Sequence, residues 1–126
     1  MRIILSEGSS LSARQAISAL GPTGARIEVC DPDPLCLGQF SRFVRAWHRC
    51  PRWNVDPVGY LRFLADRLAA ERYDVLLAVH NQAVLLARFR DDLSRRVGLA
   101  RLSQEGIRRE IRHFAQSVQS NMFVLK

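Results

Sequence analysis

Length and composition describe a chain that can fold as one domain. It has 126 residues, of which 48% are hydrophobic, enough to bury a core despite a net charge of +7. This composition excludes an intrinsically disordered chain, and no apolar run approaches the roughly 18 residues that cross a membrane. The first predicted strand begins at residue 2 with no signal-peptide pattern before it, so we expect a cytoplasmic protein.

Positive charge is concentrated in the last third of the chain. Residues 88–126 hold nine basic residues against four acidic ones, whereas residues 1–87 hold ten against eight. Such a basic segment can meet nucleic acid or an acidic partner. Its arginines alternate with apolar residues at helical spacing, as on a solvated helix face, so we do not expect nucleic-acid binding.

The three cysteines, Cys30, Cys36 and Cys50, form no C-x-x-C pair. The spacing of zinc sites and of thioredoxin-type redox motifs is therefore missing, and we expect no metal site. Cys30 closes an apolar strand, where it is expected to be a core thiol, and free thiols suit a reducing compartment.

Residues 1–20 predict a strand, a loop of small residues and a helix. The apolar run 2–5 is typical of a strand buried on both faces, and apolar residues recur at helical spacing from Ala13 to Leu20. Such a turn places backbone N–H groups and a helix N-terminus at the carboxyl edge of a sheet, where anions bind. The candidate binding residues are Ser6, Glu7, Gly8, Ser9 and Ser10. An ordinary strand-to-helix turn explains them equally well, and the G-x-G-x-x-G spacing of dinucleotide sites is missing.

Two further strands are predicted at 25–30 and 45–49, separated by a short helix or irregular crossover at 35–44. Asp31 stands at the tip of the second strand, where an acid often holds a ribose hydroxyl in nucleotide-binding folds. Two nearby prolines make a turn-forming role the alternative for this residue. His48, with no accompanying triad or metal cluster, is expected to be structural.

The second half of the chain predicts a helix that begins at Asp56-Pro57, followed by a strand at 74–79. This strand is a continuous apolar run, so we expect it to lie centrally in a parallel sheet. The candidate ligand residues at its carboxyl end are His80, Asn81 and Gln82. The remaining predicted elements are another helix, a weak strand at 96–100 and a last helix from Ser103.

Strands that alternate with helices predict an α/β fold, a three-layer Rossmann-like parallel sheet of four to five strands with helices on both faces. In such sheets ligands bind beyond the carboxyl ends of the strands, where the strand order reverses. If the first and fourth strands are neighbours, the loops 6–10 and 80–82 face one crevice. No nucleophile–base pair is visible in the sequence, so no catalytic residue is assigned.

Three stretches of the sequence carry a resemblance: ILSEGSSLSARQAISALGPTGARIEVCD, LGQFSRFVRAWHRCP and ERYDVLLAVHNQAVLLARFRDDL. They resemble the N-terminal, pre-ATP-grasp domain of ATP-grasp proteins similar to carbamoyl-phosphate synthase large chains. The likeness covers residues 2–107, so we place a pre-ATP-grasp domain at 1–107, and the C-terminal helix and tail at 108–126 do not align with the family. The resemblance implies a Rossmann-like domain that lends substrate-side loops, here 6–10 and 80–82, to an ATP-grasp enzyme.

The resemblance also implies further lobes, which close over Mg-ATP and join an activated carboxylate to an amine or similar nucleophile. Those lobes need a lysine and a glutamate-rich metal site, whereas the only lysine here is Lys126. We therefore expect no cofactor in this chain, Mg-ATP being implied only for the missing lobes. The chain would be a truncated gene product, an expression fragment or one part of a split enzyme with its ATP-grasp lobes on a separate chain.

Two functions remain open. The first is a non-catalytic N-terminal module of an ATP-grasp ligase, inactive alone, and the second is a stand-alone α/β protein that binds a small anion or nucleotide at the turn 6–10. We also expect a homodimer through the C-terminal segment, because the last helix and the tail 122–125 carry more apolar surface than a terminal helix usually exposes. A last helix packed on its own domain, with a disordered tail, is the alternative.

Overall fold

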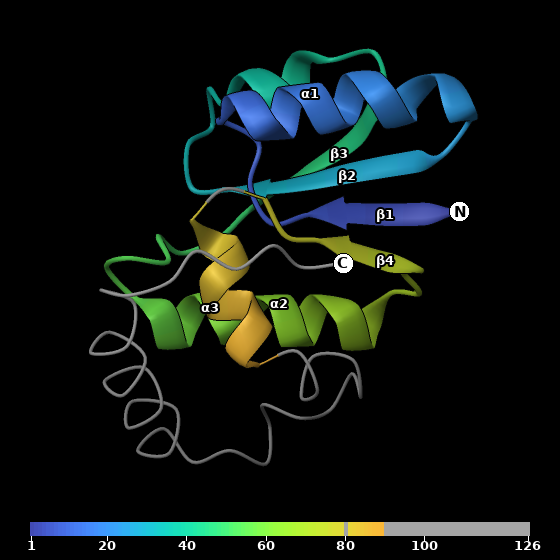
Figure 1. Cartoon of the computed structure of the whole chain (residues 1–126). Coiled ribbons are helices and arrows are strands. Elements are labelled where there is room, and N and C mark those ends of the chain that lie inside the picture. The colour runs from blue at the N-terminus through green and yellow to red at the C-terminus, as the bar shows by residue number, and fades with distance from the viewer. Residues whose placement is uncertain (80, 90–126) are drawn as a thin grey trace.

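The computed structural model describes residues 1–79 and 81–89, which form an α/β domain around a parallel sheet. The strands and helices are β1 (Arg2–Leu5), α1 (Leu11–Leu20), β2 (Arg26–Asp31), β3 (Val44–Arg49), α2 (Pro57–Ala70), β4 (Val75–Leu77) and α3 (Gln82–Arg88). All pairings in the four-stranded sheet are parallel, and the strand order is β3-β2-β1-β4 (Figure 1). The α/β class and the parallel sheet predicted from the sequence are confirmed.

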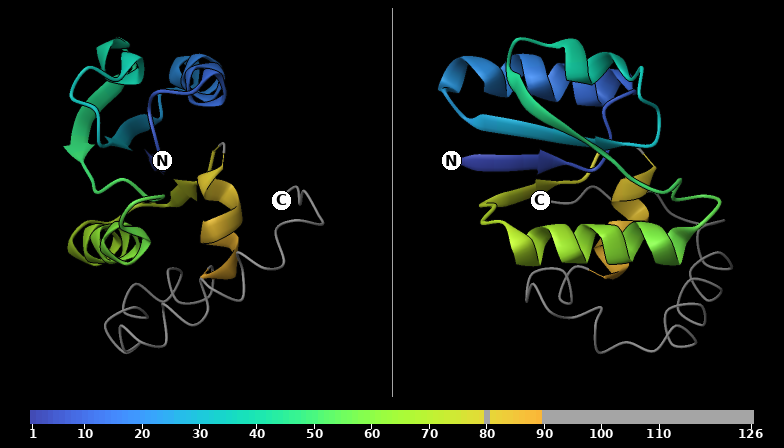
Figure 2. Two further views of the ribbon diagram at one scale, coloured as in Figure 1. Left: turned by 90° about the vertical axis from the view of Figure 1, so that its left-hand side faces the viewer. Right: turned by 180° about the vertical axis from the view of Figure 1, so that it is seen from behind.

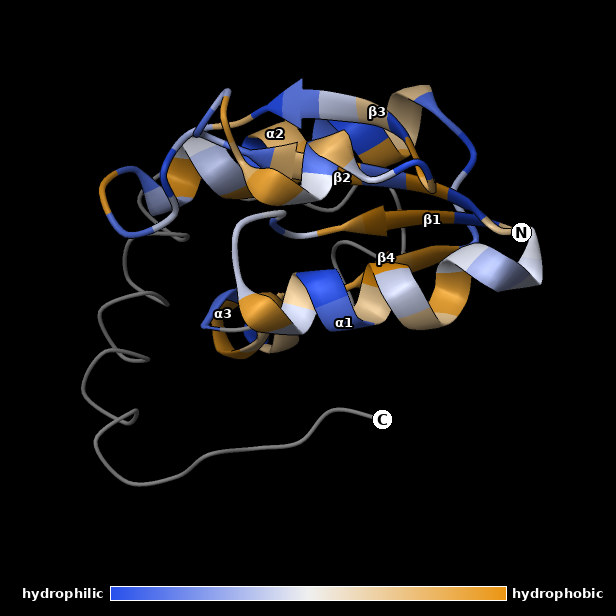
Figure 3. Ribbon diagram, turned by 90° about the horizontal axis from the view of Figure 1, so that it is seen from above, coloured by the Kyte–Doolittle hydropathy of each residue, from blue (hydrophilic) through white to orange (hydrophobic). Residues whose placement is uncertain are grey.

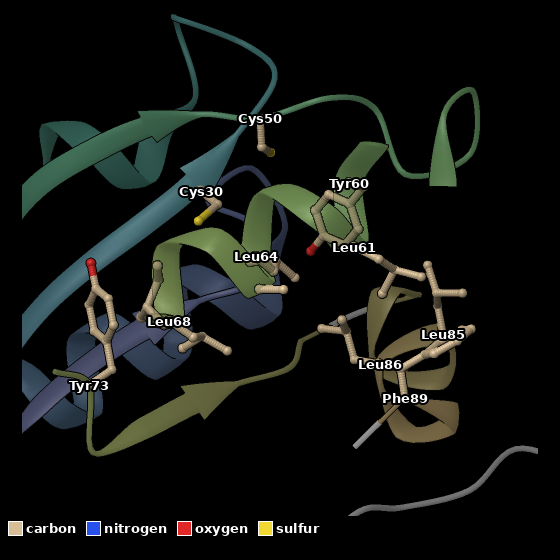
Figure 4. Packing of buried hydrophobic residues seen from close by; sticks show 12 residues of the cluster. Cys30, Cys50, Tyr60, Leu61, Leu64, Leu68, Tyr73, Leu85, Leu86 and Phe89 are labelled. Carbon is tan, nitrogen blue, oxygen red and sulfur yellow. The ribbon is translucent and has the colours of Figure 1, made fainter. Parts of the chain in front are cut away.

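Helices cover both faces of the sheet, because the residues of β1 alternate between two hydrophobic clusters. Ile3 and Leu5 pack with Ile17 of α1, whereas Ile4 packs with Leu64 of α2. Figure 1 shows α1 on one side of the sheet and α2 on the other. In Figure 4 the side chains of α2 and α3 meet in the second cluster. The result is the three-layer, Rossmann-like arrangement that the alternation of elements predicts.

Side-chain caps explain why the two longer helices begin where they do. The Ser10 hydroxyl accepts a hydrogen bond from the backbone N–H of Ala13 (3.1 Å), and Asp56 accepts one from that of Gly59 (3.0 Å). Pro57 occupies the first turn of α2, where the missing N–H costs nothing. The start of α2 agrees with the sequence, which predicted a helix that begins at Asp56-Pro57.

The prediction that the apolar run 74–79 lies centrally is wrong for the described sheet. This run contributes β4, of only three residues, and β4 forms one edge of the sheet, with Val75 37% exposed. The apolar pattern reflects burial of both faces rather than a central position, because Leu76 packs on the α2 side and Leu77 on the α1 side. The strand predicted at 96–100 and the helix from Ser103 lie outside the described residues.

The crossover from β2 to β3 is short and irregular, as predicted. It contains only the 3₁₀ helix η2 (Leu37–Phe40), which contacts α1 and β3. At the junction with β3 the register shifts between Ile27 and Glu28, and the strand then continues regularly to Arg49. Across the described part of the chain, no helix combines the length and the apolar character needed to cross a membrane.

Candidate functional site at the carboxyl edge of the sheet

The strand order reverses between β1 and β4, and Ser6 joins the two strands at that point. Its backbone N–H donates to the Leu77 carbonyl (3.1 Å), and its hydroxyl accepts from the Val79 N–H (3.0 Å). The buried Tyr60 hydroxyl of α2 donates to the Ser6 carbonyl (2.8 Å). The loop after β1 therefore lies against the chain that leaves β4, at the position where open parallel sheets bind ligands.

The side chain of Glu7 accepts hydrogen bonds from the backbone N–H groups at the start of α1. Its carboxylate is 7% exposed and accepts hydrogen bonds from the backbone N–H groups of Ser9 (3.2 Å) and Ser10 (3.1 Å). Negative charge is favourable at this end of a helix. The donors that would otherwise be offered to an anion are thus held by a side chain of the same loop.

Asp31 fills the rest of the turn from the neighbouring strand. It is 3% exposed, and its Oδ2 accepts from the Gly8 N–H (3.0 Å) and from the Ser9 hydroxyl (2.7 Å). Its Oδ1 accepts from the Asp33 N–H (2.8 Å). Asp31 therefore forms the turn after β2 and also ties that turn to the loop after β1.

The η2 helix closes over the same loop. The Gly38 N–H donates to the Gly8 carbonyl (2.9 Å), and a β-carbon at position 38 would lie 2.5 Å from that oxygen. Only glycine permits this approach. Gly8 is consequently buried, and among the loop residues only Ser9 is exposed.

The structure brings together most of the residues that the sequence singled out. Glu7 to Ser10 and Asp31 form one hydrogen-bonded unit, Ser6 bonds to the chain that leaves β4, and Asn81 is exposed just before α3. Gln82 is 7% exposed, and its Oε1 has no hydrogen-bond partner. His80 lies outside the described residues. The hydrogen bonds that Glu7 and Asp31 are shown to accept come from backbone N–H groups and one hydroxyl rather than from cations, so both buried carboxylates hold the loops of this edge together.

A second buried carboxylate, Glu28 on β2, organises a cluster on the α2 face. It is 1% exposed and accepts from the Arg2 guanidinium (2.8 Å), His48 Nε2 (2.8 Å) and the Tyr73 hydroxyl (2.6 Å). Arg26 Nε donates to the same carboxylate (3.1 Å). Arg2, Arg26 and His48 lie on β1, β2 and β3, and Tyr73 lies between α2 and β4, so the carboxylate links three strands of the described sheet with the segment that enters the fourth.

The charged partners of Glu28 decide its ionisation. Burial alone would raise the pKa of this carboxyl, but hydrogen bonds from Tyr73, His48 and Arg2 outweigh burial and hold the pKa at about 2. Donation to Glu28, together with burial, raises the pKa of Tyr73. Glu28 is therefore ionised at neutral pH, and His48 Nε2 lies 2.8 Å from its carboxylate within the cluster.

Sequence reasoning missed this cluster, although a signal was present. Glu28 is the one charged side chain between Ile27 and Asp31 in an otherwise apolar strand. Buried charges need partners, and Arg2 at the start of β1 supplies one. Pairing β1 with β2 in register Ile4 to Glu28 brings the two together, which only the fold reveals.

The three thiols are free and buried, as expected for Cys30. Burial raises the pKa of Cys30 and Cys36 and raises the pKa of Cys50 to about 12. These thiols are therefore poor nucleophiles and poor metal ligands at neutral pH. Within residues 1–79 and 81–89, no three His, Cys, Asp or Glu side chains gather in a way that could hold a metal ion.

Comparison with known proteins leaves the family open: no protein-family model and no curated protein matches the chain.

Proposed function

We propose that the chain is the pre-ATP-grasp module of an ATP-grasp ligase, which supplies substrate-side loops while Mg-ATP binding and ligation belong to other lobes. The fold and the strand order support the proposal, because both candidate loops adjoin the point where the order reverses. The observation that carries it is the filled turn after β1. Glu7 and Asp31 occupy the N–H groups that a nucleotide-binding turn offers to phosphate.

The same geometry weighs against a stand-alone anion-binding protein. A phosphate at this turn would have to displace the carboxylates of Glu7 and Asp31, or else lie beside two buried negative charges. The exposed side chains of Ser9 and Asn81 at this edge suit contact with polar groups of a substrate or of a neighbouring lobe. We therefore keep the module as the proposed function.

Calorimetric titration of the purified chain with Mg-ATP tests this function. We expect no ATP hydrolysis and a dissociation constant no tighter than about 1 mM, equivalent to about 4 kcal/mol. Micromolar binding of Mg-ATP would contradict the proposal. The DNA that adjoins this coding sequence supplies the second test, since we expect it to encode lobes with the missing lysine and acidic metal site.

Co-expression with those lobes completes the test. We expect a stable complex that hydrolyses ATP in the presence of substrate, and lobes that lose this activity when the present chain is omitted. The matched variant Asn81→Ala should leave the complex intact while reducing turnover, because Asn81 is exposed at the edge and caps no helix through its side chain. Unchanged activity without the present chain would contradict a substrate-side role.

A further inference from the structure

β3 is the outermost strand on one side of the described sheet. Its only neighbouring strand there is β2, so the N–H and C=O groups on its other edge face away from the sheet. Figure 2 shows β3 across the sheet from β4. The register irregularity affects only the beginning of β3, and residues 46–49 continue in regular register. A strand edge of this kind is a template for a further strand.

Positive charge flanks this edge without a balancing acid. Residues 34–55 contain four arginines, Arg42, Arg45, Arg49 and Arg52, and no Asp or Glu. All four are exposed, and two of them belong to β3 itself. Figure 3 shows the carboxyl end of β3 as hydrophilic, in contrast with the apolar β1.

The amino end of the edge adjoins an open depression of about 520 Å³. Its lining residues are Gly24, Ala25, Arg26 and Arg45. Gly24 has a positive φ of 81° and Ala25 a small side chain, and the charged residues of the lining are Arg26 and Arg45. The side chain of Arg26 is 58% exposed even though its Nε donates to Glu28. A carboxylate side chain fits between these groups on grounds of charge.

We infer that the outer edge of β3 binds an acidic, extended polypeptide segment, which adds a strand beside residues 46–49 and places carboxylates near Arg45 and Arg49. Main-chain hydrogen bonds supply affinity in this mode of recognition, and side-chain pockets supply specificity. The exposed arginines oppose pairing with a second copy of the same edge, because like charges would then meet. The inference does not depend on the ATP-grasp proposal.

The two tryptophans of this region favour a polypeptide over nucleic acid, whereas Phe40 of η2 is exposed. Single-stranded nucleic acid is bound by aromatic rings that are free to stack on bases. Trp47 instead packs on the α1-side cluster and donates its indole N–H to the Asp31 carbonyl (3.2 Å), and Trp53 packs on the α2-side cluster. These rings support the core, whereas the backbone edge of β3 is open.

Fluorescence anisotropy with a synthetic peptide tests the inference. The probe is a labelled alternating Glu-Val peptide of about eight residues, a usual strand length. Three control ligands are measured beside it. The Lys-Val analogue tests charge, a Glu-Val peptide with alternate backbone amides methylated tests main-chain hydrogen bonding, and an oligothymidylate tests nucleic-acid binding. We expect the Glu-Val peptide alone to bind, with amide NMR shifts at residues 46–49.

Charge-reversal variants locate the site. Arg45→Glu with Arg49→Glu should weaken peptide binding at least about tenfold, whereas Arg14→Glu with Arg62→Glu, an equal charge change at exposed positions of α1 and α2, should change it less than about twofold. Arg45→Gln with Arg49→Gln gives a milder variant should reversal disturb folding. Equal binding of the Lys-Val or methylated peptide, tighter binding of the oligothymidylate, or shifts confined to other strands would overturn the inference, as would no binding of the Glu-Val peptide.

Discussion

Two buried carboxylate centres in this domain are satisfied in opposite ways. Glu28 lies against Arg2, Arg26 and His48, so its charge is matched largely by side chains. Asp31, three residues further along the same strand, is held by backbone N–H groups and one hydroxyl. The first centre is a link between strands, whereas the second shapes a turn at the carboxyl edge of the sheet.

This difference bears on function. Charge-matched clusters stabilise a fold when every member has a partner, and removing one partner is costly. A carboxylate held by amides instead takes the place of an external anion. The two centres can therefore be separated by substitution, and the predictions below begin with the largest expected effect.

Removing the Glu28 carboxylate should have the largest effect. Glu28→Gln removes the buried carboxylate that pairs with Arg2 and Arg26, leaves Arg2 with only the 40% exposed Glu71, and should lower the free energy of unfolding by about 3 kcal/mol. Urea denaturation followed by circular dichroism measures this change. The control is Glu71→Gln, whose side chain is 40% exposed in its pair with Arg2 and which should cost less than about 1 kcal/mol. Equal losses of unfolding free energy in the two variants would contradict the central role of Glu28 in the cluster.

Lowering the pH should have the next largest effect and should distinguish the Glu28 centre from the Asp31 centre. The pKa of Glu28 is about 2 in the folded protein, below its ordinary value of 4.5. The contribution of Glu28 to the free energy of unfolding is therefore complete above pH 4.5 and is lost as the pH falls toward about 2. Between about pH 5 and about pH 3 this loss amounts to about 2 kcal/mol. Unfolding free energies measured across this range should fall less steeply in Glu28→Gln. Parallel slopes for the variant and the natural chain would contradict the assignment.

Asp31→Asn should cost less than the change at Glu28. The amide keeps one acceptor but turns an N–H donor toward the donors of Gly8, Ser9 or Asp33, so we expect a loss of about 1.5 kcal/mol. Amide hydrogen exchange should accelerate at Gly8 and Asp33 while the Glu28 cluster keeps its protection. Faster exchange spread evenly over the whole sheet would show that the two centres are not separate.

Glu7→Ala should have the smallest effect on stability, about 1 kcal/mol, because Ser10 still caps α1. The variant removes the side chain that holds the N–H groups of Ser9 and Ser10. Thermal unfolding measures the loss, with Ser12→Ala, an exposed position in the first turn of α1, as control. A loss above about 3 kcal/mol would indicate a structural role beyond the turn.

Periodicity and capping signals predicted the elements of the fold well. Features that depend on pairing between distant parts of the chain could not be predicted in this way. The strand at 2–5 and the helix start at Asp56-Pro57 are local features, and they appear where expected. The edge position of β4 depends on strand order, which an apolar run does not encode. The sequence singled out loop 6–10 and Asp31 separately, but it could not show that Glu7 and Asp31 would occupy the loop's donors.

Phosphate titration monitored by amide NMR tests the central claim, that internal carboxylates occupy the first turn. For the natural chain we predict that the amide signals of Gly8, Ser9 and Ser10 show no saturable shift up to about 10 mM phosphate. In Glu7→Ala the signals of Ser9 and Ser10 should begin to shift, because their N–H groups are released. Saturable submillimolar binding of phosphate at these amides in the natural chain would contradict the account.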